Sequence, residues 1–158
     1  MNSAARTPVI NTREEGAIRF LGIPTALRAT GETTNGAFGL VEHLAVPPGF
    51  ASPYHVHQRE DEAFYILEGE TEFVCDGKWT TVGPGGYIFL PRGVPHGFRT
   101  PRPVKMLILI APAGFERFVM EMGEDPDMPL SPPDMEKLGA LAAKYGIDIL
   151  GPLPDQID

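Results

Sequence analysis

Glycine and proline turn signals divide this sequence into short apolar segments, and this division limits the possible folds more than any other feature. Of the 158 residues, 18 are glycine and 17 are proline, together more than a fifth of the chain. Both residue types interrupt helices and favour turns. Six segments between them suit strands of ordinary length: Phe38–Val46, Ala63–Glu68, Thr71–Cys75, Trp79–Val82, Tyr87–Leu90 and Val104–Ile110. The pattern predicts an all-β core.

Tight turns join neighbouring segments of this core. Glu68-Gly69-Glu70 and Asp76-Gly77 each stand between two of the predicted strands. Asp-Gly favours the positive φ angles of a type I′ turn, so a hairpin is expected there. Ala17–Phe20 and Thr25–Ala29 alternate less regularly and are expected as edge strands.

The last third of the chain has helical periodicity instead. A first helix is expected to end at Gly123, and its apolar positions are Phe115, Phe118, Val119 and Met122. A second helix is expected to begin with Ser131 as its N-cap and Pro132 at the first helical position, and to end at Gly146. Its apolar face carries Met135, Leu138, Leu141, Ala142 and Tyr145.

Length and charge exclude several classes of protein. With 42% hydrophobic and 22% charged residues, the sequence suits one domain over 1–158. We expect edge strands in 1–35, a barrel core in 36–112 and a helical or extended tail in 113–158. The net charge of −8 has the wrong sign for binding nucleic acid. No apolar run approaches the roughly 20 residues of a membrane helix, and the first residues lack the apolar stretch of a secretory signal. We expect a cytoplasmic protein with no membrane partner.

Two residues that could carry chemistry are given structural roles. Cys75 is the single cysteine, so an internal disulfide is impossible, and it alternates with Phe73 as a half-buried strand residue would. His43 lies within an apolar segment, and we expect an ordinary strand or surface histidine.

Three of the four histidines form a group of possible metal ligands with one glutamate. His55 and His57 are separated by one residue, and on a strand such side chains emerge on the same face. Glu62 opens the next strand and can reach the same interior, and His96 follows later in the chain. Nitrogen and oxygen ligands of this kind suit first-row divalent metals, namely Fe, Mn, Ni, Co, Cu or Zn.

The spacing of these residues resembles a known family. Gly49-x5-His55-x-His57-x4-Glu62-x6-Gly69 is similar to the first motif of the cupins, and Gly85-x5-Pro91-x-Gly93-x2-His96 is similar to the second. The second motif usually ends in Asn where this chain has Thr100, a position that is not a metal ligand in the family. The resemblance implies a double-stranded β-helix, or jelly-roll barrel, that binds one divalent metal through His55, His57, Glu62 and His96. It also implies a homodimer, for which outward-facing Tyr65 and Leu67 offer surface.

An open metal site inside an apolar barrel indicates an enzyme. Four protein ligands on an octahedral ion leave two positions for water, substrate or dioxygen. Strand alternation turns Phe64 and Ile66 inward with Glu62, and Phe98 inward with His96, which favours a flat organic substrate.

The leading functional hypothesis is a dioxygenase for flavonol-like or other enolic substrates. The sequence resembles the small quercetinase-like cupins, in which the motif glutamate is both ligand and general base, so Glu62 would have both roles. Residues 144–152 resemble their C-terminal extension and would cap the barrel mouth or brace a dimer. Two alternatives remain: a redox-neutral cyclase or isomerase for polyketide-like or sugar substrates, and a non-enzymatic metal- or ligand-binding protein.

Overall fold

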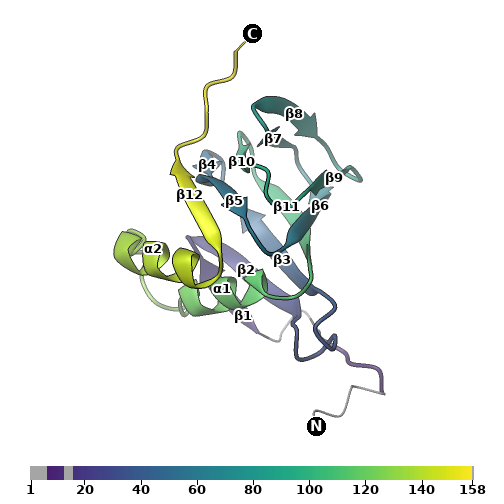
Figure 1. Cartoon of the computed structure of the whole chain (residues 1–158). Helices are drawn as coiled ribbons and strands as arrows, with labels where there is room; N and C mark the ends of the chain where they lie inside the picture. Colours follow the sequence, from purple (N-terminus) through teal and green to yellow (C-terminus); the bar gives the residue numbers. More distant parts are fainter. Residues whose placement is uncertain (1–6, 13–15, 158) are drawn as a thin grey trace.

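The fold consists of two facing β-sheets with two short helices beside them (Figure 1). The computed structural model describes residues 7–12 and 16–157. The first sheet has the strand order β1 (Ala17–Phe20), β2 (Ile23–Ala29), β3 (Gly39–Val46), β11 (Val104–Ala111), β6 (Asp61–Glu68) and β9 (Tyr87–Leu90). The second has the order β12 (Ile147–Gly151), β5 (Tyr54–His57), β10 (His96–Thr100), β7 (Thr71–Cys75) and β8 (Lys78–Val82), and β4 (Phe50–Ala51) pairs with β10. All strand pairs described are antiparallel. The predicted all-β core is confirmed.

Turn chemistry explains how neighbouring strands connect. Asp76 and Gly77 have φ angles of 50° and 75°, so the predicted hairpin between β7 and β8 is present. Gly69 joins β6 to β7 with a φ of 81°, and a Cβ atom there would collide with the carbonyl oxygen of Pro103. Only glycine fits this corner without displacing the chain that leads into β11.

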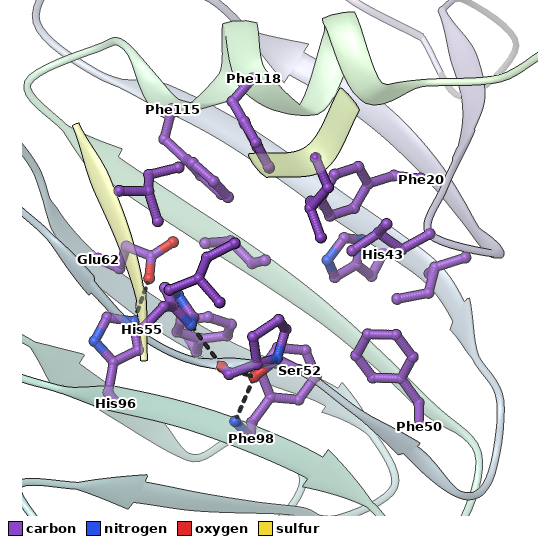
Figure 2. A pocket seen from close by; sticks show the side chains of 18 residues that line it. Phe20, His43, Phe50, Ser52, His55, Glu62, His96, Phe98, Phe115 and Phe118 are labelled. Atoms are coloured by element: carbon purple, nitrogen blue, oxygen red, sulfur yellow. Dashed lines mark hydrogen bonds and ion pairs between the residues drawn. The ribbon is translucent and has the colours of Figure 1, made fainter. Parts of the chain in front are cut away.

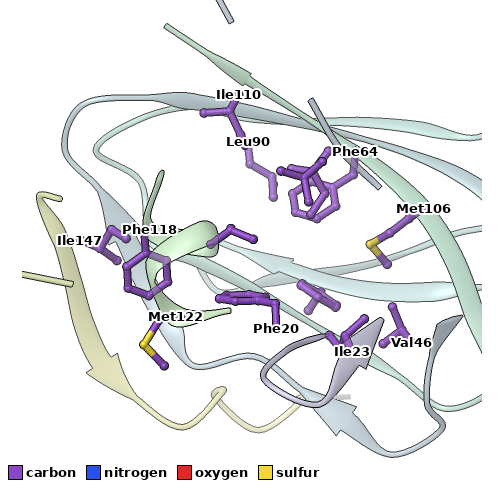
Figure 3. Close-up of a cluster of buried hydrophobic side chains, with 14 of the residues drawn as sticks. Phe20, Ile23, Val46, Phe64, Leu90, Met106, Ile110, Phe118, Met122 and Ile147 are labelled. Carbon is purple, nitrogen blue, oxygen red and sulfur yellow. The ribbon is translucent and has the colours of Figure 1, made fainter. Parts of the chain in front are cut away.

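Apolar side chains from both sheets fill the space between them and continue under the helices (Figure 3). Phe64 of β6 packs edge-on against Phe73 of β7, with their ring centroids 5.1 Å apart. Phe118 and Met122 extend the same core onto the first helix. The core is therefore continuous from the barrel to the tail of the chain.

The two helices pack against each other, with α1 next to β1 and β3 and α2 next to β12 (Figure 1). Helix α1 (Phe115–Met122) ends at Gly123, as predicted. Helix α2 (Met135–Lys144) begins later than predicted, because its N-cap is Asp134, whose side chain accepts a hydrogen bond from the Lys137 amide. With Ser131 as the cap, Pro132 would be the first helical residue, but it precedes Pro133, and a residue before proline is displaced from helical geometry. No helix among the described residues is long and apolar enough to cross a membrane.

The segment after α2 is a strand, which the sequence analysis did not predict. β12 pairs antiparallel with β5, placing Ile147 opposite His57 and Ile149 opposite His55. The tail therefore contributes directly to the second sheet. The expected division of the chain into one domain with three sections stays a prediction.

Candidate metal centre

Four candidate ligands come from three strands and meet inside the barrel. Figure 2 shows three of them, His55, Glu62 and His96. His55 and His57 lie on β5, Glu62 near the start of β6 and His96 at the start of β10, directly opposite His55. The side chains of His57, Glu62 and His96 are buried, and His55 is half-buried. The structure therefore brings together all four residues that the motif spacing indicated.

Their ligand atoms are spaced as one metal ion requires. The Nε2 atoms of His55 and His57 are 3.2 Å apart. Glu62 Oε2 lies 3.3 Å from His57 Nε2 and 2.8 Å from His96 Nε2. All four ligand atoms lie within 4.8 Å of one another. Adjacent ligands at about 2.1 Å from one ion would be about 3 Å apart, so the cluster fits a single ion.

Hydrogen bonds on the outer side of the imidazoles orient them toward this point. His55 Nδ1 lies 2.7 Å from the Pro53 carbonyl oxygen, and His96 Nδ1 lies 3.2 Å from that of Val94. A carbonyl oxygen only accepts, so Nδ1 carries the proton in both rings and Nε2 presents a lone pair to the cluster. Such outer partners are usual for histidines that bind metals.

Glu60 is a further acidic residue at this site, and the sequence analysis missed it. Its Oε2 lies 3.5 Å from His57 Nδ1, and both side chains are nearly fully buried. Neither atom has a hydrogen-bond partner among the described residues. The signal in the sequence was a glutamate three residues after a candidate ligand and two before another. Glu60 is placed to polarise and orient His57.

The electrostatics of the cluster also favour a cation. Burial acts to lower the pKa of His57, but the carboxylates of Glu62 and Glu60 outweigh it and raise this pKa to about 9. Burial, with the charges of His96 and His57, lowers the pKa of His55 to about 4. Burial acts to raise the pKa of Glu62, but His57 and His96 hold it well below its usual range. The carboxylates thus stabilise positive charge at His57, and the low pKa of His55 keeps its imidazole neutral, as a metal ligand must be.

His55, Glu62 and His96 of the cluster form one wall of a cavity of about 80 Å³ that is otherwise mostly apolar (Figure 2). Six phenylalanine rings line it: Phe20, Phe50, Phe64, Phe98, Phe115 and Phe118. Phe64 and Phe98 were expected in this position. Ile66, also expected there, lies further along β6, where it is fully buried in the core and is not part of the pocket wall.

Residues from the tail of the chain and His43 also line the pocket. Phe115 of α1 packs edge-on against His57, with ring centroids 4.6 Å apart. Leu138 of α2 and Ile147 and Ile149 of β12 also line the pocket. His43 is indeed a strand histidine, but it is buried rather than at the surface, and it lines the pocket as well. Helical periodicity identified Phe115 and Leu138 as apolar, without showing what they would cover.

The architecture and the site define a cupin. Residues 42–110 match the family model of the cupin domain, a range that contains all four candidate ligands. This segment of the chain is therefore a cupin domain. The fold of the chain is similar to that of KdgF from Halomonas sp., with a TM-score of 0.62 and 20% sequence identity over 70% of this chain and 99% of that chain.

Two curated proteins are similar to parts of this sequence. The chain is 42% identical over 66 residues to the dimethylsulfoniopropionate lyase DddQ of Ruegeria pomeroyi, a match that covers 40% of this chain and 32% of that protein. It is 30% identical over 97 residues to the quercetin 2,3-dioxygenase of Bacillus subtilis, which covers 61% of this chain and 28% of that protein. The matched segments span about a third or less of the length of these relatives.

Proposed function

We propose that this protein is a metal-dependent dioxygenase for a compact enolic or aromatic molecule. The observation that carries the proposal is the four-residue cluster, of which His55, Glu62 and His96 lie on the wall of a pocket lined by six phenylalanine rings. The four residues would hold one divalent ion, namely Fe, Mn, Ni, Co, Cu or Zn. When bound, the ion would supply Lewis acidity and, for a redox-active metal, a route for electrons to dioxygen.

The protein's own residues would bind the substrate and take its proton. The aromatic rings suit a flat, mostly apolar molecule and keep water from the reacting groups. Glu62 lines the pocket as well as the cluster, and its Oε2 contacts both His57 and His96. Its Oε1 is then left to accept the proton of a substrate hydroxyl, which would make Glu62 the general base.

The size of the pocket favours a single-ring substrate over a three-ring flavonol. The cavity of about 80 Å³ is well below the 300–1,000 Å³ that ligand pockets commonly reach. A flavonol would require the elements over the pocket, α1, α2 and β12, to move outward. A compact enol would enter with smaller side-chain rearrangements.

Dioxygen uptake tests the proposal directly. Protein reconstituted separately with each of the six metals is supplied with single-ring enols, catechols and flavonols, and oxygen consumption is recorded. We expect uptake that depends on both the metal and the substrate and that is lost in a His55→Ala/His57→Ala protein. Metal-loaded protein that consumes no oxygen with any of these substrates would refute dioxygenase function.

A redox-neutral reaction is the second candidate, and the similarity to a lyase favours it. Elimination, cyclisation and isomerisation all need a base that removes a proton beside a metal-bound group, a role that Glu62 could have equally well. Product formation without oxygen in Zn-loaded protein, lost in Glu62→Gln, would support this candidate over the first.

We also propose that the protein forms a homodimer through the outer face of the first sheet. Tyr65, Tyr87, Phe89 and Leu109 are 41–63% exposed. Strand register places Tyr65 beside Tyr87, and Ala63 between Phe89 and Leu109, so these side chains form one continuous patch across β9, β6 and β11. Apolar patches of this kind commonly mark protein interfaces.

A further inference from the structure

His43 lies on the side of the pocket opposite the candidate metal ligands. Figure 2 shows it beside Phe20, across the cavity from Glu62 and His96. Its ring stacks on Phe20, with an interplanar angle of 6°, and the residue is only 3% exposed. The ring is therefore held firmly in one orientation at this end of the pocket.

Hydrogen bonding determines which nitrogen of His43 carries the proton. Thr25 Oγ1 lies 3.0 Å from the Ile23 carbonyl oxygen and 2.9 Å from His43 Nδ1. A carbonyl oxygen cannot donate, so the single hydroxyl proton of Thr25 is committed to Ile23. The Thr25 oxygen can then only accept from His43, which makes Nδ1 the protonated nitrogen. Nε2 consequently carries a lone pair.

This lone pair has no partner among the described residues, although the side chain is more than nine-tenths buried. The ring is neutral, because burial lowers the pKa of His43 to about 4. Ser52 is the other polar side chain of the pocket outside the cluster, and it is already occupied: its hydroxyl donates to the Pro53 carbonyl and accepts from the Phe98 amide. Because His43 lines the apolar pocket, its unpaired Nε2 is an acceptor that can take a hydrogen bond from a donor on the ligand.

We propose that His43 is a substrate-binding residue whose Nε2 accepts a hydrogen bond from a hydroxyl or N–H group at the end of the ligand remote from the metal. The ligand class is then a flat apolar molecule with one metal-binding end and one hydrogen-bond donor opposite. A ligand with an ether or carbonyl oxygen at the end remote from the metal would have no proton to donate and would leave Nε2 unpaired. This inference deepens the proposed function, and its binding test is independent of turnover.

Two probes of similar shape separate donor recognition from general apolar binding. Phenol carries a donor where toluene carries a methyl group, and both are titrated into Zn-loaded protein, with affinity read from chemical shifts. A long-range ¹H–¹⁵N spectrum gives the protonation of both His43 nitrogens. We expect Nδ1 to be protonated, Nε2 to be unprotonated, and phenol but not toluene to shift the Nε2 resonance.

Three substitutions test the role of the acceptor. His43→Phe keeps the ring without nitrogen, and we expect it to reduce the preference for phenol over toluene roughly three- to tenfold, the range for one net hydrogen bond. His43→Asn keeps a donor for Thr25 but does not reach the position of Nε2, so it should lose the preference equally. His43→Gln places an amide oxygen near that position and should restore it in part. If His43→Phe does not fold, His43→Asn provides the same comparison.

Several outcomes would overturn the inference. One is a protonated Nε2, and another is an unchanged preference for phenol over toluene in His43→Phe or His43→Asn. A third is that phenol does not bind, including the case in which it fails to displace a water held on Nε2. Phenol preference without oxygenase turnover would support the role of His43 and refute the proposed dioxygenase. Oxygenase turnover without a preference for phenol would support the dioxygenase and refute the role of His43.

Discussion

Substitution of Glu60 by glutamine tests whether a residue outside the ligand set controls metal binding. Glu60→Gln keeps the size of the side chain and removes its negative charge next to His57. The Nδ1 and Oε2 atoms that face each other are 3.5 Å apart, and both lack another partner among the described residues. When an ion binds to Nε2, the ring becomes more positive, and the carboxylate stabilises this charge.

The expected loss follows from this geometry. Replacing the outer partner of a metal-binding histidine typically lowers metal affinity by about 10- to 100-fold, or roughly 1.4–2.7 kcal/mol. A separation of 3.5 Å is longer than a good hydrogen bond. We therefore expect the lower end of the range for Glu60→Gln, about tenfold, because the charge contributes more than the hydrogen bond does.

The assay is competition for Zn²⁺ or Ni²⁺ between the protein and a chromogenic chelator at fixed pH. Asp61→Asn is the matched control: it removes the same charge from the adjacent residue, whose carboxylate pairs with Arg92, 3.1 Å away, outside the site. We expect this variant to change affinity less than about twofold. Equal losses in both variants would show a net-charge effect and refute the role of Glu60, as would an unchanged affinity in Glu60→Gln.

Three further predictions concern stability and assembly. The pKa of His43 is about 4 in the folded protein and 6.5 without burial. Between pH 4 and 6.5, the His43 ring is therefore protonated in the unfolded state and neutral in the folded state. Unfolding free energy should then fall by about 3 kcal/mol more in the wild type than in His43→Phe between pH 6.5 and 4, as chemical denaturation would show. Tyr87→Lys should shift a dimer toward monomer in sedimentation velocity, and a dimer of unchanged stability would place the interface elsewhere. Asp134→Ala should cost about 1 kcal/mol in chemical denaturation by removing the cap of α2, whereas Ser131→Ala should cost nothing measurable.

Local chemistry made much of the fold predictable. The turn at Asp76-Gly77 depends on positive φ angles that these two residue types favour. The end of α1 was visible because its apolar periodicity stops before Gly123. The candidate ligands were identifiable because His55 and His57 share a strand face and the motif spacing supplied Glu62 and His96. These features require no knowledge of distant contacts.

Features that depend on contacts between distant segments could not be predicted. β12 is short, and its pairing with β5 joins segments about 90 residues apart. Ile66 points inward as Phe64 does, but it lies further along β6. It is therefore part of the core, whereas Phe64 lines the pocket. The role of His43 depends on the hydroxyl of Thr25, which belongs to another strand.

The pairing of β5 has a consequence for the order in which the site can be assembled. β5 is in register with β12 at four positions, but with β10 only where His55 faces His96. β12 is synthesised after every other strand that the structure describes. On the ribosome, the strand that carries two of the candidate ligands therefore remains a free edge until residues 147–151 emerge. An ion that arrives earlier would meet histidines whose backbone is not yet held, so stable metal loading should follow, rather than guide, completion of the barrel.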